Sequence, residues 1–354
     1  GYTLRETFVP GTDRFTQDQD FEGERWDIGV NLSGNVEYSP DERNSISLNY
    51  LAGPRWENNP ETLNSEFRDS TDSPYRGYLR EIESTEDGWN ADASLNWTNK
   101  GKVKGSEWNS SLSASYYSDL DAGTFNQTDY DPTGLPLTQT SEISRTQRFR
   151  GSQVSTAQID RVQMLGSTWL RKLEFGLRGN FRRIDSDLDA DSLDIATDQW
   201  FRDTLLTAAF RYDEYVSAAY LQFAGGIGKR FEFQVGLRSE HTIAQGFLDG
   251  NQQAFDKRYI NFFPTTNLKF TAGKSTEISF GYARRINRPG FWSLNPFPDY
   301  SDPFNIRRGN PDLDPELTDA FELGLSKSIK SHYIYAAGFF RYTNNPMQRL
   351  ISVD

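Results

Sequence analysis

The chain has 354 residues, a formal net charge of −12, no cysteine and two histidines. The acidic balance argues against nucleic acid as a partner, because phosphates are bound by Lys and Arg. The lack of cysteine excludes a disulfide scaffold and thiolate metal sites, and His241 and His332 leave little for a multi-histidine centre. No apolar run approaches the ~20 residues of a spanning helix, and the N-terminus shows no signal-peptide pattern. Hydropathy alone would indicate a soluble protein, but transmembrane barrels escape that test because only every second residue faces lipid.

Residues 1–23 are polar, and we expect them to be irregular. From Trp26 to residue 52, apolar and polar residues alternate on either side of a turn at Ser39–Glu42, which predicts an amphipathic β-hairpin. The same unit recurs five times, so about twelve strands are expected. The later turns are predicted near Asn99–Lys104, Leu165–Ser167, Gly225–Gly228, Gly273–Lys274 and Lys330–Ser331.

The connections decide the predicted class. Long polar segments separate the hairpins, at about 57–86, 118–145, 186–203, 243–256 and 288–315. Short and long connections therefore alternate, which is typical of an up-and-down antiparallel transmembrane β-barrel with short periplasmic turns and long extracellular loops. The apolar rows end in Trp or Tyr, as for Trp89 with Trp97 and Trp108 with Tyr116, which fits two lipid–water interfaces. The alternative all-β folds, a sandwich, propeller or repeat protein, have shorter strands of about five or six residues.

One stretch carries a recognisable motif. An Arg288-Pro289 step is followed by LNPF at Leu294–Phe297, an acidic spacer, and GNPDLDPE at Gly309–Glu316. This order resembles a stretch of the TonB-dependent outer-membrane receptors and transporters. The resemblance implies a barrel of about twenty-two strands around a plug, in the outer membrane of a Gram-negative bacterium. Residues 1–354 are then expected to be a barrel portion that lacks the plug domain and the C-terminal strands.

The resemblance also implies a function. External loops capture a scarce ligand such as a siderophore, glycan, peptide or cobalamin, and an energy-transducing TonB complex pulls on the plug using the inner-membrane proton-motive force. The implied partners are outer-membrane lipid and lipopolysaccharide, the plug, the TonB complex and a surface lipoprotein lid, with no cofactor and no nucleic acid. Three alternatives stay open: a passive porin-like or adhesive barrel, a soluble extracellular β-rich binding protein, and an outer-membrane barrel enzyme. No catalytic grouping is visible, so we predict that the chain is not an enzyme.

Two sets of residues are candidates for binding. The aromatic residues of the motif stretch either stack on a ligand or pack the loop, and we favour packing: Trp292, Phe297, Tyr300 and Phe304. Asn295 and Asn310, each before a proline, are predicted to cap turns. The second set lies on the polar parity and would bind an anionic ligand, dock the plug, or remain solvated: Arg178, Arg182, Arg238, Glu240 and Arg285.

A row of four aspartates falls in the predicted connection 186–203 and just before it: Asp185, Asp187, Asp189 and Asp191. Carboxylates in that number are suitable ligands for calcium. The twelve-residue calcium-loop pattern fails, however, because Ala190 replaces its glycine and Ala196 its bidentate glutamate. We therefore predict a solvated acidic loop.

Overall fold

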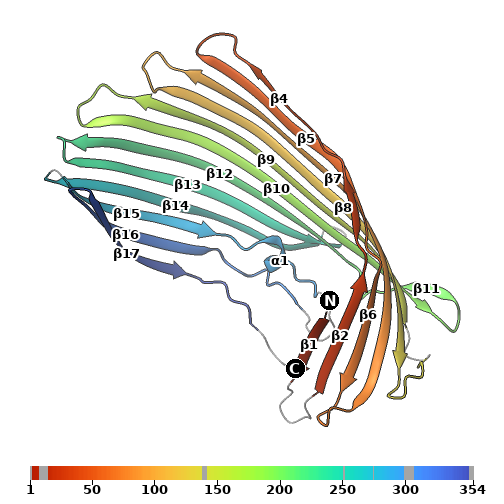
Figure 1. Cartoon of the computed structure of the whole chain (residues 1–354). Helices are drawn as coiled ribbons and strands as arrows, with labels where there is room; N and C mark the ends of the chain where they lie inside the picture. Colours follow the sequence, from red (N-terminus) through yellow and green to blue (C-terminus); the bar gives the residue numbers. More distant parts are fainter. Residues whose placement is uncertain are drawn as a thin grey trace.

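The computed structural model describes residues 2–7, 15–137, 142–249, 252–273, 275–298 and 307–350. In these residues the chain forms one antiparallel sheet of 17 strands and a single helical turn (Figure 1). No described helix is long and apolar enough to span a bilayer. The elements are β1 (Tyr2–Thr7), β2 (Phe15–Gly23), β3 (Trp26–Gly29), β4 (Leu32–Tyr38), β5 (Asn44–Asn58), β6 (Glu61–Arg68), β7 (Pro74–Lys100), β8 (Glu107–Tyr130), β9 (Glu142–Met164), β10 (Leu170–Asp194), β11 (Gln199–Arg202), β12 (Ala208–Ile227), β13 (Phe231–Leu248), β14 (Gln252–Ala272), β15 (Thr276–Asn287), α1 (Phe291–Leu294), β16 (Glu316–Ile329) and β17 (His332–Asn344).

Several of these strands are parts of one longer strand. β2, β3 and β4 run in line and pair with β6 and β5, which in turn both pair with β7. Counted this way, twelve long strands cross the sheet, with β1 added at one edge and β11 paired with the end of β10. The predicted number of strands is confirmed.

Each of the six predicted hairpin connections joins two strands as expected, but the fourth turn lies after its predicted position, because Gly225–Ile227 still belong to β12. At one end of the sheet the chain turns at residues 39–43, 101–106, 165–169, 228–230 and 330–331, and at the same end it passes from β14, which ends at Ala272, to β15, which begins at Thr276. Gly105 and Gly228 have φ angles of 83° and 63°, a left-handed conformation that glycine adopts at little cost. The prediction that residues 1–23 are irregular is wrong where they are described, because Tyr2–Thr7 and Phe15–Gly23 are strands.

The opposite end is elaborated, but mostly by strand rather than by loop. The predicted connections 57–86, 118–145, 186–203 and 243–256 are largely extensions of β5 to β14. Both faces of an extension beyond the bilayer are wetted by water, so no apolar row is required and the alternation that reveals a strand disappears. Only residues 288–315 form a long connection in which the described part is mainly irregular.

The sheet curves into an open arc, with α1 inside the curve (Figure 1). Among the described residues no pairing joins β17 to β1 or to β2–β4. We call the face that carries α1 the polar face and the other the apolar face. The apolar face exposes large side chains to its surroundings; Leu177 is 59% exposed and Ile159, opposite it on β9, is 40% exposed.

The apolar band has the height of a membrane. On β7, Trp89 and Trp97 lie eight residues apart on the apolar face, which corresponds to ~26 Å along a strand. Outer-membrane barrels carry an apolar band ~25 Å tall between two aromatic girdles, with the strands tilted. The aromatic rows predicted from the sequence therefore bound a band that hydrocarbon can cover.

The two faces predict opposite tolerances to substitution. Leu177→Arg places a charge near the middle of the apolar band of β10, and we expect it to cost roughly 2–4 kcal/mol of folding free energy in a bilayer. Arg178→Leu, its neighbour on the polar face, is expected to be tolerated. Urea unfolding of the protein folded into liposomes measures both, and equal losses would contradict the assignment of faces.

Candidate functional site

The antiparallel register determines which polar-face residues are neighbours. Arg178 on β10 lies opposite Ala218 on β12, which lies opposite Glu240 on β13. Four residues further along β10, Arg182 lies opposite Glu214. Arg238 lies on the same face of β13 as Glu240, and its Nε donates to Glu240 Oε1 at 2.5 Å. The structure thus brings Arg238 and Glu240 into contact, and Arg178 and Arg182 onto the same wall.

Three of the predicted arginines remain exposed on this wall. Arg178, Arg182 and Arg285 form no side-chain hydrogen bond or ion pair with another described residue. Arg285 lies on the same face of β15 as Ala283. Ala283 pairs with Thr265 on β14, and Thr265 pairs with Gly236, which is on the same face of β13 as Glu240, so Arg285 is also on the polar face. The three guanidinium groups therefore line one arc of the polar face, spread over β10 to β15.

Arg288 is the residue of this site that the sequence did not single out for binding. It follows β15 directly, and its guanidinium donates to the buried carboxylate of Glu240 and, at 3.2 Å, to Thr242 Oγ1. Glu240 is 8% exposed and Thr242 is fully buried. A buried carboxylate requires such partners, because an unpaired charge away from water is costly. The available signal was the position of Arg288 at the start of the motif.

Beyond Arg288 the connection folds inward onto the polar face. Phe291 and Leu294 of α1 pack against Phe210 and Tyr212 of β12 and Ala244 of β13, and the rings of Phe210 and Phe291 are 5.1 Å apart. This connection is rich in proline and glycine, which disfavour regular elements. One helical turn nevertheless forms between Gly290 and Asn295, where no proline interrupts it.

The two halves of the motif bind each other through their backbones. The amide of Gly309 donates to the Asn295 carbonyl at 2.9 Å, and that of Asn310 donates to the Ser293 carbonyl at 2.7 Å. A Cβ at Gly309 would lie 2.6–2.7 Å from three carbonyl oxygens, so only glycine fits there. Asn295 Oδ1 and Asn310 Oδ1 accept the amides of Phe297 and Asp312, at 3.0 and 2.9 Å, which confirms the predicted turn caps.

The end of the motif is tied to β14, to β15 and to the segment that follows β17. Glu316 accepts from Asn287 Nδ2 at 2.7 Å and from the backbone amide of Met347 at 2.5 Å. Lys257 Nζ on β14 donates to the carbonyl of Leu313 at 2.6 Å. The described parts of the connection are therefore held by specific bonds at their beginning, middle and end.

The structure places the described aromatic candidates in different environments. Phe297 is partly buried and packs against the α1 cluster, as the packing interpretation expected. Trp292 is 67% exposed and contacts Phe291 edge to face at 5.0 Å. Tyr300 and Phe304 lie outside the described residues. Among the described aromatic candidates, Trp292 is therefore the one whose side chain is mostly exposed.

The aspartate row is not in a loop, which corrects the sequence prediction. Asp185, Asp187, Asp189 and Asp191 lie on β10, with the parity of the apolar face but beyond its apolar band. Arg145 pairs with Asp191 at 2.9 Å and Arg202 pairs with Asp189. Within the described part of the chain no cluster of His, Asp or Glu side chains is arranged to hold a metal ion.

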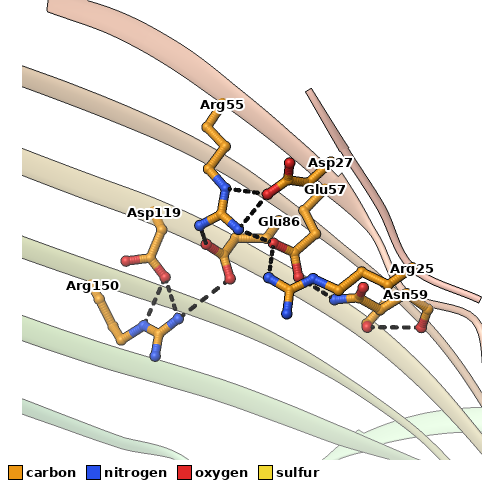
Figure 2. Close-up of polar contacts among 9 residues, drawn as sticks. Arg25, Asp27, Arg55, Glu57, Asn59, Glu86, Asp119 and Arg150 are labelled. Atoms are coloured by element: carbon orange, nitrogen blue, oxygen red, sulfur yellow. Dashed lines mark hydrogen bonds and ion pairs between the residues drawn. The ribbon is translucent and has the colours of Figure 1, made fainter. Parts of the chain in front are cut away.

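A second polar cluster spans the N-terminal half of the wall (Figure 2). Figure 2 shows the Arg55 guanidinium among three carboxylates, and Arg55 Nε donates to Asp27 Oδ2 at 3.1 Å. Arg150 Nε donates to Asp119 Oδ2 at 2.7 Å. Both arginines form ion pairs with the Glu86 carboxylate, Arg150 at 3.6 Å and Arg55 at 3.8 Å. This charge ladder crosses β3, β5, β7, β8 and β9, and its members are Arg25, Asp27, Arg55, Glu57, Glu86, Asp119 and Arg150.

Desolvation and hydrogen bonding shift the pKa values of two carboxylates of the ladder in opposite directions. Glu86 lies three residues beyond Trp89, outside the apolar band, and its pKa is raised by desolvation and by the nearby carboxylates of Asp119 and Glu57. The arginines Arg150 and Arg55 oppose that rise only in part. The pKa of Glu57 is lowered instead, by a hydrogen bond from Asn59 and by the charges of Arg25 and Arg55. The ionised form of Glu57 is therefore stabilised, whereas the ionised form of Glu86 is destabilised.

Comparison with known proteins identifies the family. The model of the outer membrane protein beta-barrel family matches residues 99–354, more than two thirds of the chain. The chain belongs to this family. Its polar face is the wall of a barrel lumen, its apolar face contacts the lipid of the Gram-negative outer membrane, and the soluble alternative is excluded. No curated protein matches the sequence significantly.

The solved structures that the chain resembles include two transporters and an uptake receptor. The unliganded ferric citrate transporter FecA is 12% identical (97% of this chain, 51% of that chain, TM-score 0.46). The ferric yersiniabactin uptake receptor FyuA from Yersinia pestis is 14% identical (94% and 52%, TM-score 0.39). The copper transporter OprC is 12% identical (96% and 52%, TM-score 0.43). The barrel chain spans about half the length of these structures.

The inward-folded connection predicts an asymmetric pair of glycine substitutions. Gly309→Ala forces a methyl group against three carbonyl oxygens and is expected to destabilise the barrel by about 1–3 kcal/mol. Gly290→Ala is the matched control, because a Cβ there meets nothing within 4 Å. Limited proteolysis of the connection and thermal unfolding measure the difference. Equal protease resistance of the two variants would show that the motif halves are not held together.

The ladder predicts a pH-dependent effect of Glu86→Gln. Because the folded-state pKa of Glu86 is raised, its ionisation destabilises the fold, increasingly as the pH rises from the unfolded pKa through the folded one. The variant should therefore gain stability relative to the native protein between acidic and neutral pH. Urea midpoints at pH 4 and pH 7.5 test this, and a difference that is constant or of opposite sign contradicts it.

Proposed function

We propose that this chain is a portion of the barrel of a TonB-dependent outer-membrane transporter. In the whole protein, a plug domain fills the lumen, external loops capture a scarce ligand such as a siderophore, glycan or peptide, and a TonB complex drives uptake with proton-motive force. No chemistry is done on the ligand. The observation that carries the proposal is the two-part motif, which resembles that of these transporters and is built into the lumenal wall.

The lumenal arginines support a plug. Arg178, Arg182 and Arg285 are of like charge and face one space from β10 to β15, and none forms an ion pair with a described acidic residue, although Glu214 lies opposite Arg182. Acidic side chains of a plug would neutralise them, and bidentate arginine–carboxylate bonds would also fix its orientation. We assign these three residues to plug docking.

The residues near the connection take other roles in the proposal. Arg238, Glu240 and Arg288 hold the base of the connection against the wall. Trp292, exposed beside this anchored base, is the aromatic surface that we assign to ligand contact. An aromatic ring on a fixed base binds with little loss of conformational freedom, which favours affinity for a dilute ligand.

A passive porin-like barrel is the second candidate. The charge ladder of β3 to β9 favours it, because such a wall is also suited to a water-filled pore. The two candidates differ in conductance: a plugged barrel is closed to ions, whereas a passive pore conducts continuously.

Conductance of the full-length protein in planar bilayers is the experiment that tests the proposal. We expect no steady current from the native protein until added urea displaces the plug. The triple variant Arg178→Gln/Arg182→Gln/Arg285→Gln should open at a lower urea concentration than the native protein, because its plug is bound more weakly. The control is Arg307→Gln/Arg308→Gln, which removes exposed charges from the connection after β15 and should behave as the native protein. Steady conductance of the native protein would establish the passive pore.

A further inference from the structure

The lysines of the chain are concentrated at one end of the sheet. Nine of the ten lie in the six short hairpin turns or within four residues of them: Lys100, Lys102, Lys104, Lys172, Lys229, Lys269, Lys274, Lys327 and Lys330. Lys274 lies outside the described residues. The tenth, Lys257, bonds the connection after β15.

The short-turn end is basic in an otherwise acidic protein. The turns with their flanks, residues 38–45, 98–108, 163–174, 227–233, 269–277 and 326–333, contain twelve Lys or Arg and six Asp or Glu. The whole chain has 38 basic and 50 acidic residues. The opposite end and the walls therefore carry the negative excess.

Most acidic groups at this end are already engaged. Glu174 pairs with Lys172 at 2.5 Å and Glu277 with Lys269 at 2.7 Å. Asp41 accepts the backbone amides of Arg43 and Asn44, at 2.7 and 2.9 Å. In the hairpins β7–β8, β12–β13 and β16–β17, seven exposed basic residues form no ion pair with any described acidic residue, and we call them the basic rim: Lys100, Lys102, Lys104, Lys229, Arg230, Lys327 and Lys330.

The basic rim lies at the depth of lipid phosphates. Lys100 follows Trp97 by three residues, and Lys104 precedes Trp108 by four, so the rim begins within ~10–13 Å of the aromatic girdle along the strands. Tilt of the strands shortens that height, and the headgroup layer is ~5–7 Å deep on each side of the hydrocarbon. The flexible stem of a lysine spans the remaining distance by snorkelling back toward the interface.

We propose that the basic rim binds the phosphate groups of anionic phospholipids in the periplasmic leaflet of the outer membrane. Short turns face the periplasm in these barrels, which places the rim at that leaflet. The rim residues are spread over the β7–β8, β12–β13 and β16–β17 hairpins rather than converging on one pocket. A compact free phosphate requires convergent donors, whereas a ring of lipid headgroups is matched by a distributed row.

The strength of the interaction follows from general electrostatics. Each Lys or Arg near an anionic surface contributes about fivefold to binding, and the effect decays within a Debye length. Several such residues along one edge should therefore enrich anionic lipid around the protein and hold the barrel at a defined depth. The enrichment should fall as salt is raised.

The test uses the full-length protein reconstituted in bilayers with equal amounts of phosphatidylglycerol and phosphatidylethanolamine. Mass spectrometry of the lipids that co-purify in small bilayer discs measures phosphatidylglycerol enrichment. We expect enrichment around the native protein, and its loss in Lys102→Gln/Lys104→Gln/Lys229→Gln/Lys330→Gln. Arg307→Gln/Arg308→Gln, at the opposite end, is the control and should retain it.

Three results would overturn the proposal: no enrichment by the native protein, undiminished enrichment by the fourfold variant, or equal loss in the control. Displacement of the lipid by millimolar inorganic phosphate would also overturn it, since the rim would then be a site for free phosphate. Heat-modifiable migration on gels verifies that each variant is folded. If the fourfold variant does not fold, Lys102→Gln/Lys104→Gln replaces it, with a smaller loss of enrichment expected.

Discussion

A chain that crosses hydrocarbon as strands must pair every backbone amide and carbonyl with a neighbouring strand, because lipid offers no substitute for water. The long registers meet this requirement without interruption. β7 and β8 pair from Gly77 with Tyr130 to Lys100 with Glu107, and β9 and β10 pair over a similar length. The ladder does not stop at the aromatic girdle, and the strands continue well beyond the apolar band.

This continuous ladder also decides the chemistry of the wall. Since side chains alternate between faces, an unshifted register places every second residue of each strand on the lumen side. Asp119 consequently faces Arg150 across β8 and β9, and its burial is tolerated because the guanidinium lies against it. The charged groups of the N-terminal half of the wall are thereby paired with one another, whereas the wall from β10 to β15 keeps exposed arginines beside an inward-folded connection.

The connection after β15 illustrates how an irregular segment is held without a regular element of more than one turn. Its backbone groups pair between the two halves of the motif, and its apolar side chains cover Phe210 and Tyr212. Proline and glycine limit the freedom of the unfolded segment and permit close backbone approach, as at Gly309. The motif is therefore explained to a large extent by the architecture of the connection, and Trp292 is the part left exposed to make contacts.

Some of this could be predicted from the sequence and some could not. The alternation around Leu177 and Arg178 assigned the faces correctly, because lipid on one side and water on the other impose a period of two. The same rule failed at Asp185–Asp191 and at residues 15–23, where both faces are wet and a strand has no periodic signature. Asn295 and Asn310 were assigned correctly as turn caps because their bonds are local, within two residues along the chain.

By itself the sequence determined what depends on neighbours along the chain: the strands within the apolar band, the six turns, the two faces and the basic short-turn end. Only the tertiary structure decided which residues meet across strands. Arg55 meets Glu86 and Arg288 meets Glu240 over 31 and 48 positions of sequence, respectively. Residues so far apart in the sequence meet because each hairpin fixes the register of the next pair of strands. A slip of one residue in any register would turn the side chains of that strand to the other face.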